Sequence, residues 1–339
     1  MLLSALWVKP LACERLPSKC AKLIILFVNP IQQKKGEAMK YEKVSQTINI
    51  KDDEFVTVKE MGNLTEVKYN SNPNTEPRTI KLSKEEFLVK STGEIKEYET
   101  YAKDKSECIG SVRKSMKRIR ELINSNVVEP SYVRWCCLTY KDNVQDREKV
   151  YQDFRKFNQR FKYYLQKKGL PIPEFIDILE PQGRGSFHHH LLYIWNEKAP
   201  YIPNADFERL WGHGFTKVQK IDGITNVAAY LTAYLSDMEL PEDKWEYLKY
   251  FDESEVKEMV INGERKAFVK GQRLKLYPSN MNIVRHSKGI KYPEVQKMPL
   301  REAKKRVCDK VLTYHTTYKL SNEQGYSTII DRKEYCSNY

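Results

Sequence analysis

Three residues near the middle of the chain have the types and the spacing of metal ligands. His188 and His190 flank His189 in an apolar run that is predicted to form a β-strand. Residues two apart in a strand point to the same face, about 6.6 Å from each other, so the two outer imidazoles can converge on one ion. If residues 182–185 form a tight hairpin, the carboxylate of Glu180 reaches the same ion. A His-His-carboxylate set leaves positions open for water and a substrate phosphate.

Two tyrosines follow within reach of this set. Tyr230 and Tyr234 are four residues apart in a segment, about 224–238, that is predicted to be helical, so both hydroxyls share one face. Because the chain has 22 tyrosines, core packing also explains the spacing. A phenol with a pKa near 10 is a poor nucleophile at neutral pH, and a nearby divalent cation that polarises a phosphate offsets that handicap. We expect in-line attack on a DNA phosphodiester, which gives a 5′-phosphotyrosine and a free 3′-hydroxyl.

The elements that would position these residues follow a regular order. The patterns predict strands at 132–140, 174–181, 186–195 and about 214–220, with helices at 147–168 and about 204–211. The order is βαββαβ. It predicts an α+β fold with a ferredoxin-like or RRM-like antiparallel sheet and helices on one face.

The flanking sequence divides into further segments. Residues 1–38 are interpreted as a non-native or disordered extension, since codons for 34–39 can resemble a bacterial ribosome-binding site before a start at Met39. We expect a strand-rich segment at 39–103, a nicking domain at 104–240 and a basic C-terminal segment at 241–339. Helices are predicted at 104–126, 242–260 and 299–312, with two short closing strands after them.

The charge of the chain favours a polyanionic partner. Its 58 Lys and Arg exceed its 45 Asp and Glu, for a net charge of +13, which is typical of nucleic-acid-binding proteins. Solvated surface charges would also explain the basic residues, but we expect DNA contacts from Arg184, Lys217, Lys220, Lys270, Arg273 and Lys275. The seven cysteines include no CxxC pair, which indicates reduced thiols and a cytoplasmic protein. No apolar run reaches the about 20 residues of a membrane span, so no membrane partner is expected.

Three motifs in order resemble those of rolling-circle replication initiators in the HUH (His-hydrophobe-His) endonuclease superfamily. They are CCLTY (136–140), FHHHLL (187–192) and YLTAY (230–234). The flanking stretches EPQGRG (180–185), LWGHGF (210–215) and KGQRLKLYPSN (270–280) look most like replication proteins of bacterial mobile elements and filamentous-type phages.

The resemblance implies a role for each candidate residue. His188, His190 and Glu180 would hold Mg²⁺ or Mn²⁺, Tyr230 would be the nucleophile, and Tyr234 its partner in a second transfer. The substrate would be single-stranded DNA at a replication origin. The sequence departs from the family pattern at His189, where a bulky apolar residue is usual, and at Ala233, where many relatives have a lysine.

Other functions fit parts of the same pattern. No GxxxxGK[ST] nucleotide-binding loop is present, so unwinding and synthesis would need a host helicase and polymerase. A relaxase or a single-strand transposase uses the same chemistry, although the chain length, the missing helicase domain and the paired tyrosines favour replication. A non-catalytic RRM-like nucleic-acid binder would instead need exposed aromatic side chains on the open face of the sheet.

Overall fold

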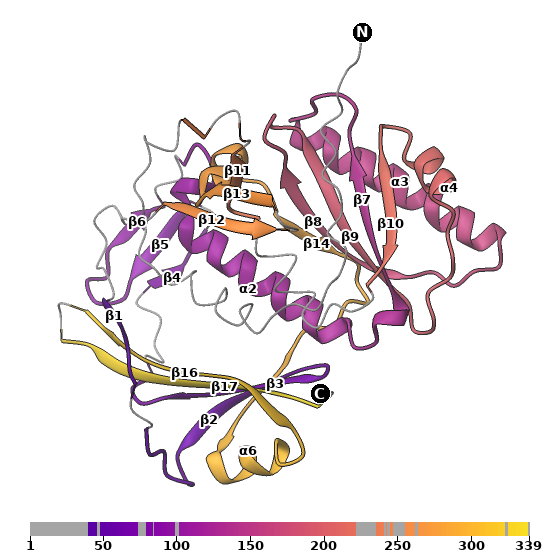
Figure 1. The fold of residues 1–339 in the computed structure, drawn as a ribbon. Helices are drawn as coiled ribbons and strands as arrows, with labels where there is room; N and C mark the ends of the chain where they lie inside the picture. The colour runs from indigo at the N-terminus through magenta and orange to yellow at the C-terminus, as the bar shows by residue number, and fades with distance from the viewer. Residues whose placement is uncertain are drawn as a thin grey trace. The chain divides into compact units, whose positions relative to one another are not determined.

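The computed structural model describes most of the chain beyond residue 39 (Figure 1). The described residues are 40–45, 48–73, 79–83, 85–98, 102–221, 235–240, 242, 245–246, 255–261, 264–322 and 325–337. They divide into two compact units. The first comprises 104–120 and 129–290, and the second comprises the described residues up to 103, then 121–128 and those from 291 onward. The segment boundaries expected from the sequence, at 39, 104 and 241, stay a prediction.

A five-stranded antiparallel sheet forms the centre of the first unit. Its strands are β7 (Val133–Thr139), β8 (Glu174–Pro181), β9 (Phe187–Ile194), β10 (Thr216–Lys220) and β14 (Val284–His286). The strand order is β10-β7-β9-β8-β14. Every neighbouring pair is antiparallel. The α+β class and the order βαββαβ that the sequence predicts are both present.

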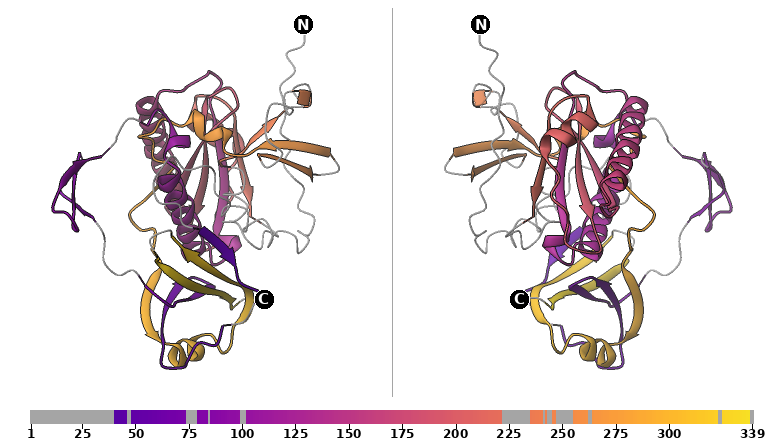
Figure 2. Two further views of the ribbon diagram at one scale, coloured as in Figure 1. Left: turned by 90° about the vertical axis from the view of Figure 1, so that its left-hand side faces the viewer. Right: turned by 90° about the vertical axis from the view of Figure 1, so that its right-hand side faces the viewer.

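Two helices cover one face of this sheet. Helix α3 (Arg147–Lys167) runs beside the strands (Figure 2) and begins at Asp146, whose side chain accepts a hydrogen bond from the backbone N–H of Glu148. Its Phe154 ring lies 5.3 Å from the Phe175 ring of β8. Helix α4 (Asn204–Trp211) adds Phe207, whose ring lies edge-on to Phe157 of α3 at 5.0 Å. Burial of these aromatic side chains anchors both helices to the sheet.

The C-terminal half of the first unit differs from the sequence prediction. Residues 256–260, predicted as part of a helix over 242–260, lie in strand β12 (Val256–Ile261). This strand pairs with β13 (Glu264–Val269), which also pairs with β11 (Met238–Leu240). Pairing between segments distant in the sequence overrode the local helical pattern. Strand β14, which no pattern predicted, extends the central sheet next to β8.

The second unit contains a six-stranded antiparallel sheet in the order β1-β16-β17-β3-β2-β15. The strands are β1 (Lys40–Lys43), β2 (Phe55–Met61), β3 (Leu64–Asn70), β15 (Glu294–Pro299), β16 (Val311–Ser321) and β17 (Ser327–Cys336). The closing strands are therefore long rather than short. Helix α6 (Leu300–Arg306) packs on the sheet, and a core of Val56, Val58, Val67, Met298, Ala303 and Val307 lies between them.

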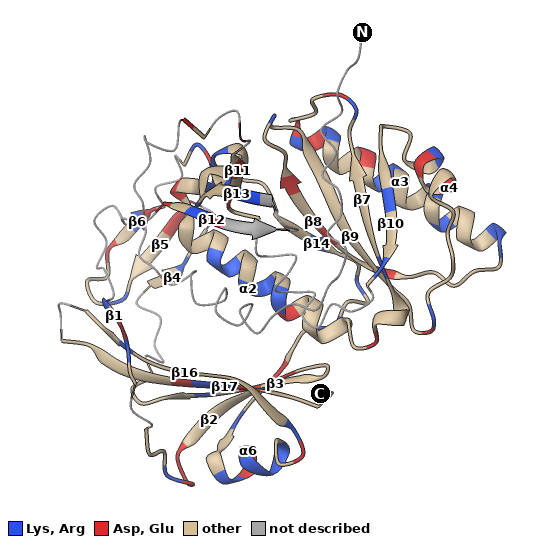
Figure 3. Ribbon diagram, in the orientation of Figure 1, with Lys and Arg blue, Asp and Glu red and all other residues tan. Residues whose placement is uncertain are grey.

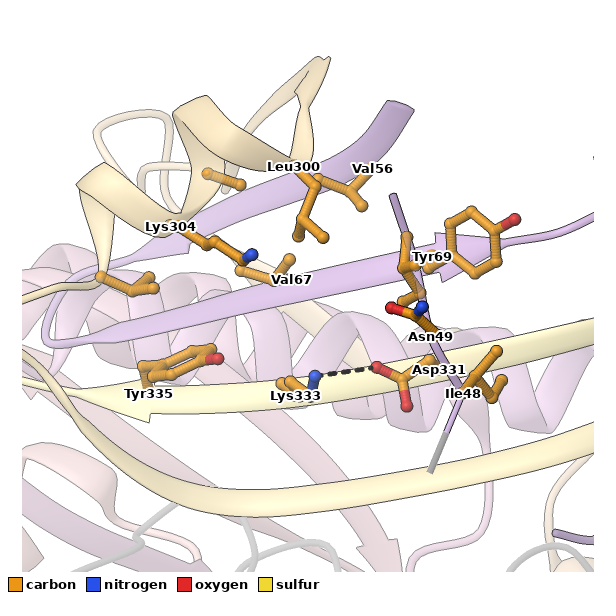
Figure 4. A pocket seen from close by; sticks show the side chains of 13 residues that line it. Ile48, Asn49, Val56, Val67, Tyr69, Leu300, Lys304, Asp331, Lys333 and Tyr335 are labelled. Carbon is orange, nitrogen blue, oxygen red and sulfur yellow. Dashed lines mark ion pairs between the residues drawn. The ribbon is translucent and has the colours of Figure 1, made fainter. Parts of the chain in front are cut away.

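The expected helix over 299–312 is wrong in its second half. Helix α6 ends at Arg306, and β16 begins at Val311. A cavity of about 210 Å³ opens beside α6, with Asp331 and Lys333 forming an ion pair at its wall (Figure 4).

Two further elements complete the described chain. Strands β4 (Thr79–Lys81), β5 (Glu86–Val89) and β6 (Ile95–Glu97) form a small antiparallel sheet. Helix α2 (Ile109–Asn126) is the shorter observed form of the helix predicted over 104–126. Among the described helices, none is long and apolar enough to cross a membrane.

Candidate metal centre

A tight hairpin between β8 and β9 sets the register of the predicted metal ligands. The backbone N–H of Gln182 donates to the carbonyl of Ser186 at 2.8 Å, and Gly185 adopts a φ of 88°, which favours glycine. This turn places Glu180 directly opposite His188 across the two strands. Because His190 is two residues further along β9, its side chain is on the same face of the sheet.

The three side chains converge as the spacing predicts. Oε2 of Glu180 lies 3.1 Å from Nε2 of His188 and 2.5 Å from Nε2 of His190. One ligand atom from each residue lies within 4.8 Å of the others. The side chains are 11%, 18% and 16% exposed for Glu180, His188 and His190, so the cluster is largely desolvated but reachable from solvent. Two imidazoles and one carboxylate fit a divalent cation and leave coordination positions for other ligands.

The protonation of the cluster is consistent with a cation-binding role. Burial raises the pKa of Glu180, but hydrogen bonds from both histidines outweigh this and hold it well below its usual value. Burial and the charge of His190 lower the pKa of His188. Burial lowers the pKa of His190 as well, yet Cys137 and Glu180 together raise it to about 10. The proton between His190 and Glu180 therefore sits where a cation would replace it, and cation binding must release it.

Outer contacts hold two of the three ligands in place. A guanidinium nitrogen of Arg273 contacts the second carboxylate oxygen of Glu180 and also donates to the carbonyl of Pro181 at 3.0 Å. Nε of Arg273 donates to the carbonyl of Asp237 at 2.9 Å. On the other side, Sγ of Cys137 lies 3.5 Å from Nδ1 of His190. Such outer partners fix the orientation of ligands in metal sites.

The middle histidine belongs to a separate cluster on the helix-covered face. Nδ1 of His189 lies 2.9 Å from a carboxylate oxygen of Asp177, and Nε of Arg285 donates to the other oxygen at 3.1 Å. The ring of His189 stacks on Phe154, with 5.2 Å between the centroids. His189 and Asp177 are fully buried, and Nε2 of His189 has no hydrogen-bond partner among the described residues. This histidine points away from the metal ligands, as the alternation of a strand requires.

The basic residues expected to contact DNA occupy different environments. Arg184 folds back from the hairpin and donates to the carbonyl oxygens of Tyr140, at 2.6 Å, and Lys141, at 3.2 Å. Lys217 is part-buried on β10 and lies opposite Cys137, so it shares the face of the metal ligands. Lys220 and Lys275 are exposed, and Lys270 is part-buried. Arg273 alone among the six contacts a predicted metal ligand, a role that the sequence analysis did not predict.

The predicted nucleophiles, Tyr230 and Tyr234, lie outside the described residues. They fall in the interval between β10, which ends at Lys220, and β11, which begins at Met238. Their assignment therefore depends on the sequence motif.

Comparison with known proteins gives one match. Residues 133–239 match the model of a family described as replication-associated protein ORF2. The matched range begins at the first residue of β7, contains all three metal-ligand candidates and both tyrosines, and ends within β11. The match supports the resemblance to rolling-circle replication initiators. No significant match was found among curated proteins or among solved structures.

Proposed function

Because residues 133–239 are similar to this family of replication-associated proteins, we propose that the chain is a rolling-circle replication initiator that nicks the origin strand through a tyrosine. The observation that carries this proposal is the convergence of Glu180, His188 and His190 on one face of the central sheet. A nicking enzyme needs such a site beside its nucleophile, since phosphodiester cleavage requires stabilisation of charge on the phosphate.

The topology of the first unit supports the same proposal. The first four strands of its sheet in chain order, β7, β8, β9 and β10, lie in the spatial order β10-β7-β9-β8. With α3 and α4 on one face, this is the arrangement of a ferredoxin-like or RRM-like fold. We propose that it is an HUH endonuclease domain, with the metal ligands on the face opposite α3 and α4.

The reaction divides between the metal site and the chain's own residues. Glu180, His188 and His190 would hold Mg²⁺ or Mn²⁺, which when bound would polarise the phosphate and stabilise its developing charge. Arg273 and Cys137 would keep Glu180 and His190 oriented. Lys217, on the same face, would attract the phosphate backbone of the origin strand.

The covalent step belongs to a tyrosine. The phenolate oxygen of Tyr230, or of Tyr234, attacks the phosphorus, the bond from phosphorus to the 3′-oxygen breaks, and the leaving oxygen takes a proton from water. The products are a 5′-phosphotyrosine and a free 3′-hydroxyl that a polymerase can extend. One phosphodiester replaces another, so the step is reversible, and the second tyrosine can join the displaced strand in a later transfer.

A cleavage assay tests the proposal. A single-stranded oligonucleotide that carries the element's own origin is incubated with the protein and Mn²⁺ or Mg²⁺, then resolved on a denaturing gel. We expect a covalent protein–DNA band that disappears with EDTA and in Glu180→Gln, and that persists in the control His213→Ala. Binding of the oligonucleotide without an adduct under any metal would instead identify a non-catalytic nucleic-acid binder.

A further inference from the structure

A second polar cavity lies in the first unit, away from the metal ligands in the sequence. It has a volume of about 180 Å³ and is lined by residues of helix α2 and of the segment leading into β14, together with Lys105. The lining residues are Lys105, Ser111, Lys114, Ser115, Arg118, Met281, Asn282, Ile283 and Val284. None of these nine described residues is acidic, whereas three are cationic. The cavity is therefore suited to an anion.

Lys105 gives the strongest reason to expect a ligand in this cavity. The residue is only 7% exposed. Within the described part of the chain, its ammonium group makes no hydrogen bond or ion pair, and burial lowers the pKa of Lys105. A buried cation without a partner destabilises a protein unless something compensates its charge. A bound anion would supply that compensation.

The rim of the cavity offers further donors at helical spacing. Ser111 and Ser115 lie four residues apart on α2, and so do Lys114 and Arg118, so each pair shares a face of the helix. A guanidinium nitrogen of Arg118 lies 3.1 Å from Nε2 of His286, which fixes this side chain beside the cavity. Hydroxyl, ammonium and guanidinium groups are the side-chain donors that commonly bind phosphate.

We propose that this cavity binds a phosphodiester group of the single-stranded DNA that the metal centre cuts. The proposal rests on the proposed function for its polymeric ligand. A polymer fits better than a free anion because Lys and Arg continue along α2 beyond the cavity, at Arg113 and Lys117 (Figure 3). A single anion would be satisfied by the cavity alone, whereas a DNA backbone presents a phosphate at every nucleotide.

DNA binding in the absence of a divalent metal tests this inference. Fluorescence anisotropy with a labelled single-stranded oligonucleotide in EDTA gives Kd over a series of KCl concentrations. In Lys105→Met we expect Kd to rise about fivefold and the slope of log K against log salt to become shallower by about 0.7, the loss of one phosphate contact. The matched control is Lys162→Gln, an exposed lysine of α3 outside the cavity, and it should leave both quantities near the wild-type values.

Thermal stability separates a ligand-binding lysine from a structural one. If Lys105 serves a ligand, Lys105→Met removes an uncompensated buried charge, and Tm without DNA should stay the same or increase. If Lys105 is a structural residue, Tm should fall, which would overturn the proposal. Should Lys105→Met fail to fold, the exposed rim variant Lys114→Gln is measured in its place, with the same expected change in slope.

Three outcomes would contradict the inference. They are an unchanged Kd and slope in folded Lys105→Met, an equal loss in Lys162→Gln, and stabilisation by inorganic phosphate that does not compete with DNA. The last would indicate a site for free phosphate. Since all binding is measured in EDTA, failure of the cavity leaves cleavage by the wild type intact. Conversely, loss of cleavage in Glu180→Gln should leave binding at the cavity intact.

Discussion

Two carboxylates of the same strand show how similar groups can serve different purposes. Asp177 and Glu180 are three residues apart on β8, and they face opposite sides of the sheet. Each meets histidine from β9 and one arginine from the C-terminal part of the unit, Arg285 for Asp177 and Arg273 for Glu180. Asp177 is fully buried beneath α3, whereas the Glu180 cluster keeps a path to solvent.

Electrostatics alone does not distinguish the two clusters. For both carboxyls, burial acts to raise the pKa, and their histidine partners lower it further than burial raises it. What differs is the number of histidines and their accessibility. Glu180 meets two rings that can bind a shared cation, and Asp177 meets one ring that is closed in by aromatic side chains. We therefore assign catalysis to the Glu180 cluster and structural support to the Asp177 cluster.

The largest difference should appear in cleavage by His190→Ala. Loss of a metal ligand should reduce the cleavage rate by about 10³-fold or more, since the charge on the phosphate is no longer stabilised. The rate is measured on a single-stranded origin oligonucleotide under single-turnover conditions. His213→Ala, a partly exposed histidine of the loop after α4, should cut at nearly the wild-type rate. Equal activity of His190→Ala and the wild type would remove the metal centre from the mechanism.

Stability should respond in the opposite order. Asp177→Asn should lower the free energy of unfolding by about 3 kcal/mol, because it leaves Arg285 without its carboxylate in a buried network. Glu180→Gln should lower it by about 1 kcal/mol or less, since that cluster is partly solvated and its amide can still accept hydrogen bonds. Urea unfolding provides both values. A larger loss in Glu180→Gln would reverse the assignment of the two clusters.

Metal binding should couple to stability at only one of the clusters. At a Mn²⁺ concentration about 100 times Kd, the wild type should gain about 2.7 kcal/mol of unfolding free energy. Asp177→Asn should gain the same increment from its lower starting point, whereas Glu180→Gln should gain almost none. Thermal unfolding with and without Mn²⁺ measures the increments. An increment that survives in Glu180→Gln would place the ion elsewhere.

The smallest expected effect concerns pH. Because the folded-state pKa of Asp177 lies below its unfolded value of about 3.9, its ionised form contributes stability above about pH 4. That contribution is lost as the pH falls through the folded-state pKa. The difference in unfolding free energy between wild type and Asp177→Asn should therefore narrow below about pH 4, as followed by urea unfolding at a series of pH values. A constant difference down to acid unfolding would show that the ionised form contributes nothing.

The sequence predicted the parts of the site that depend on local geometry. His188 and His190 follow from the two-residue period of a strand, and Glu180 follows from a tight turn with a glycine at Gly185. Arg273 and Arg285 lie 93 and 108 residues from the carboxylates that they contact. No local period connects positions so distant, so only the folded chain shows these pairs.

The same distinction explains the errors in secondary structure. The helix predicted over 299–312 stops at Arg306, and the next residues include Val311 and Tyr314, β-branched and aromatic types that favour a strand. That strand is completed by ten partners in β17, which a local pattern does not indicate. Where pairing partners are close in sequence, as in the β8–β9 hairpin, the predicted boundaries hold to within a residue or two.

The central claim is that the metal centre serves a tyrosine of the segment 221–234, and mapping of the covalent adduct tests it most directly. After cleavage with Mn²⁺, the adduct is digested with nuclease and trypsin, and the peptide 221–244 is examined by mass spectrometry. We predict a nucleotide attached through phosphate to Tyr230 or Tyr234, and no adduct when both are replaced by phenylalanine. An adduct on any other residue, or one that persists in the double variant, would contradict the account.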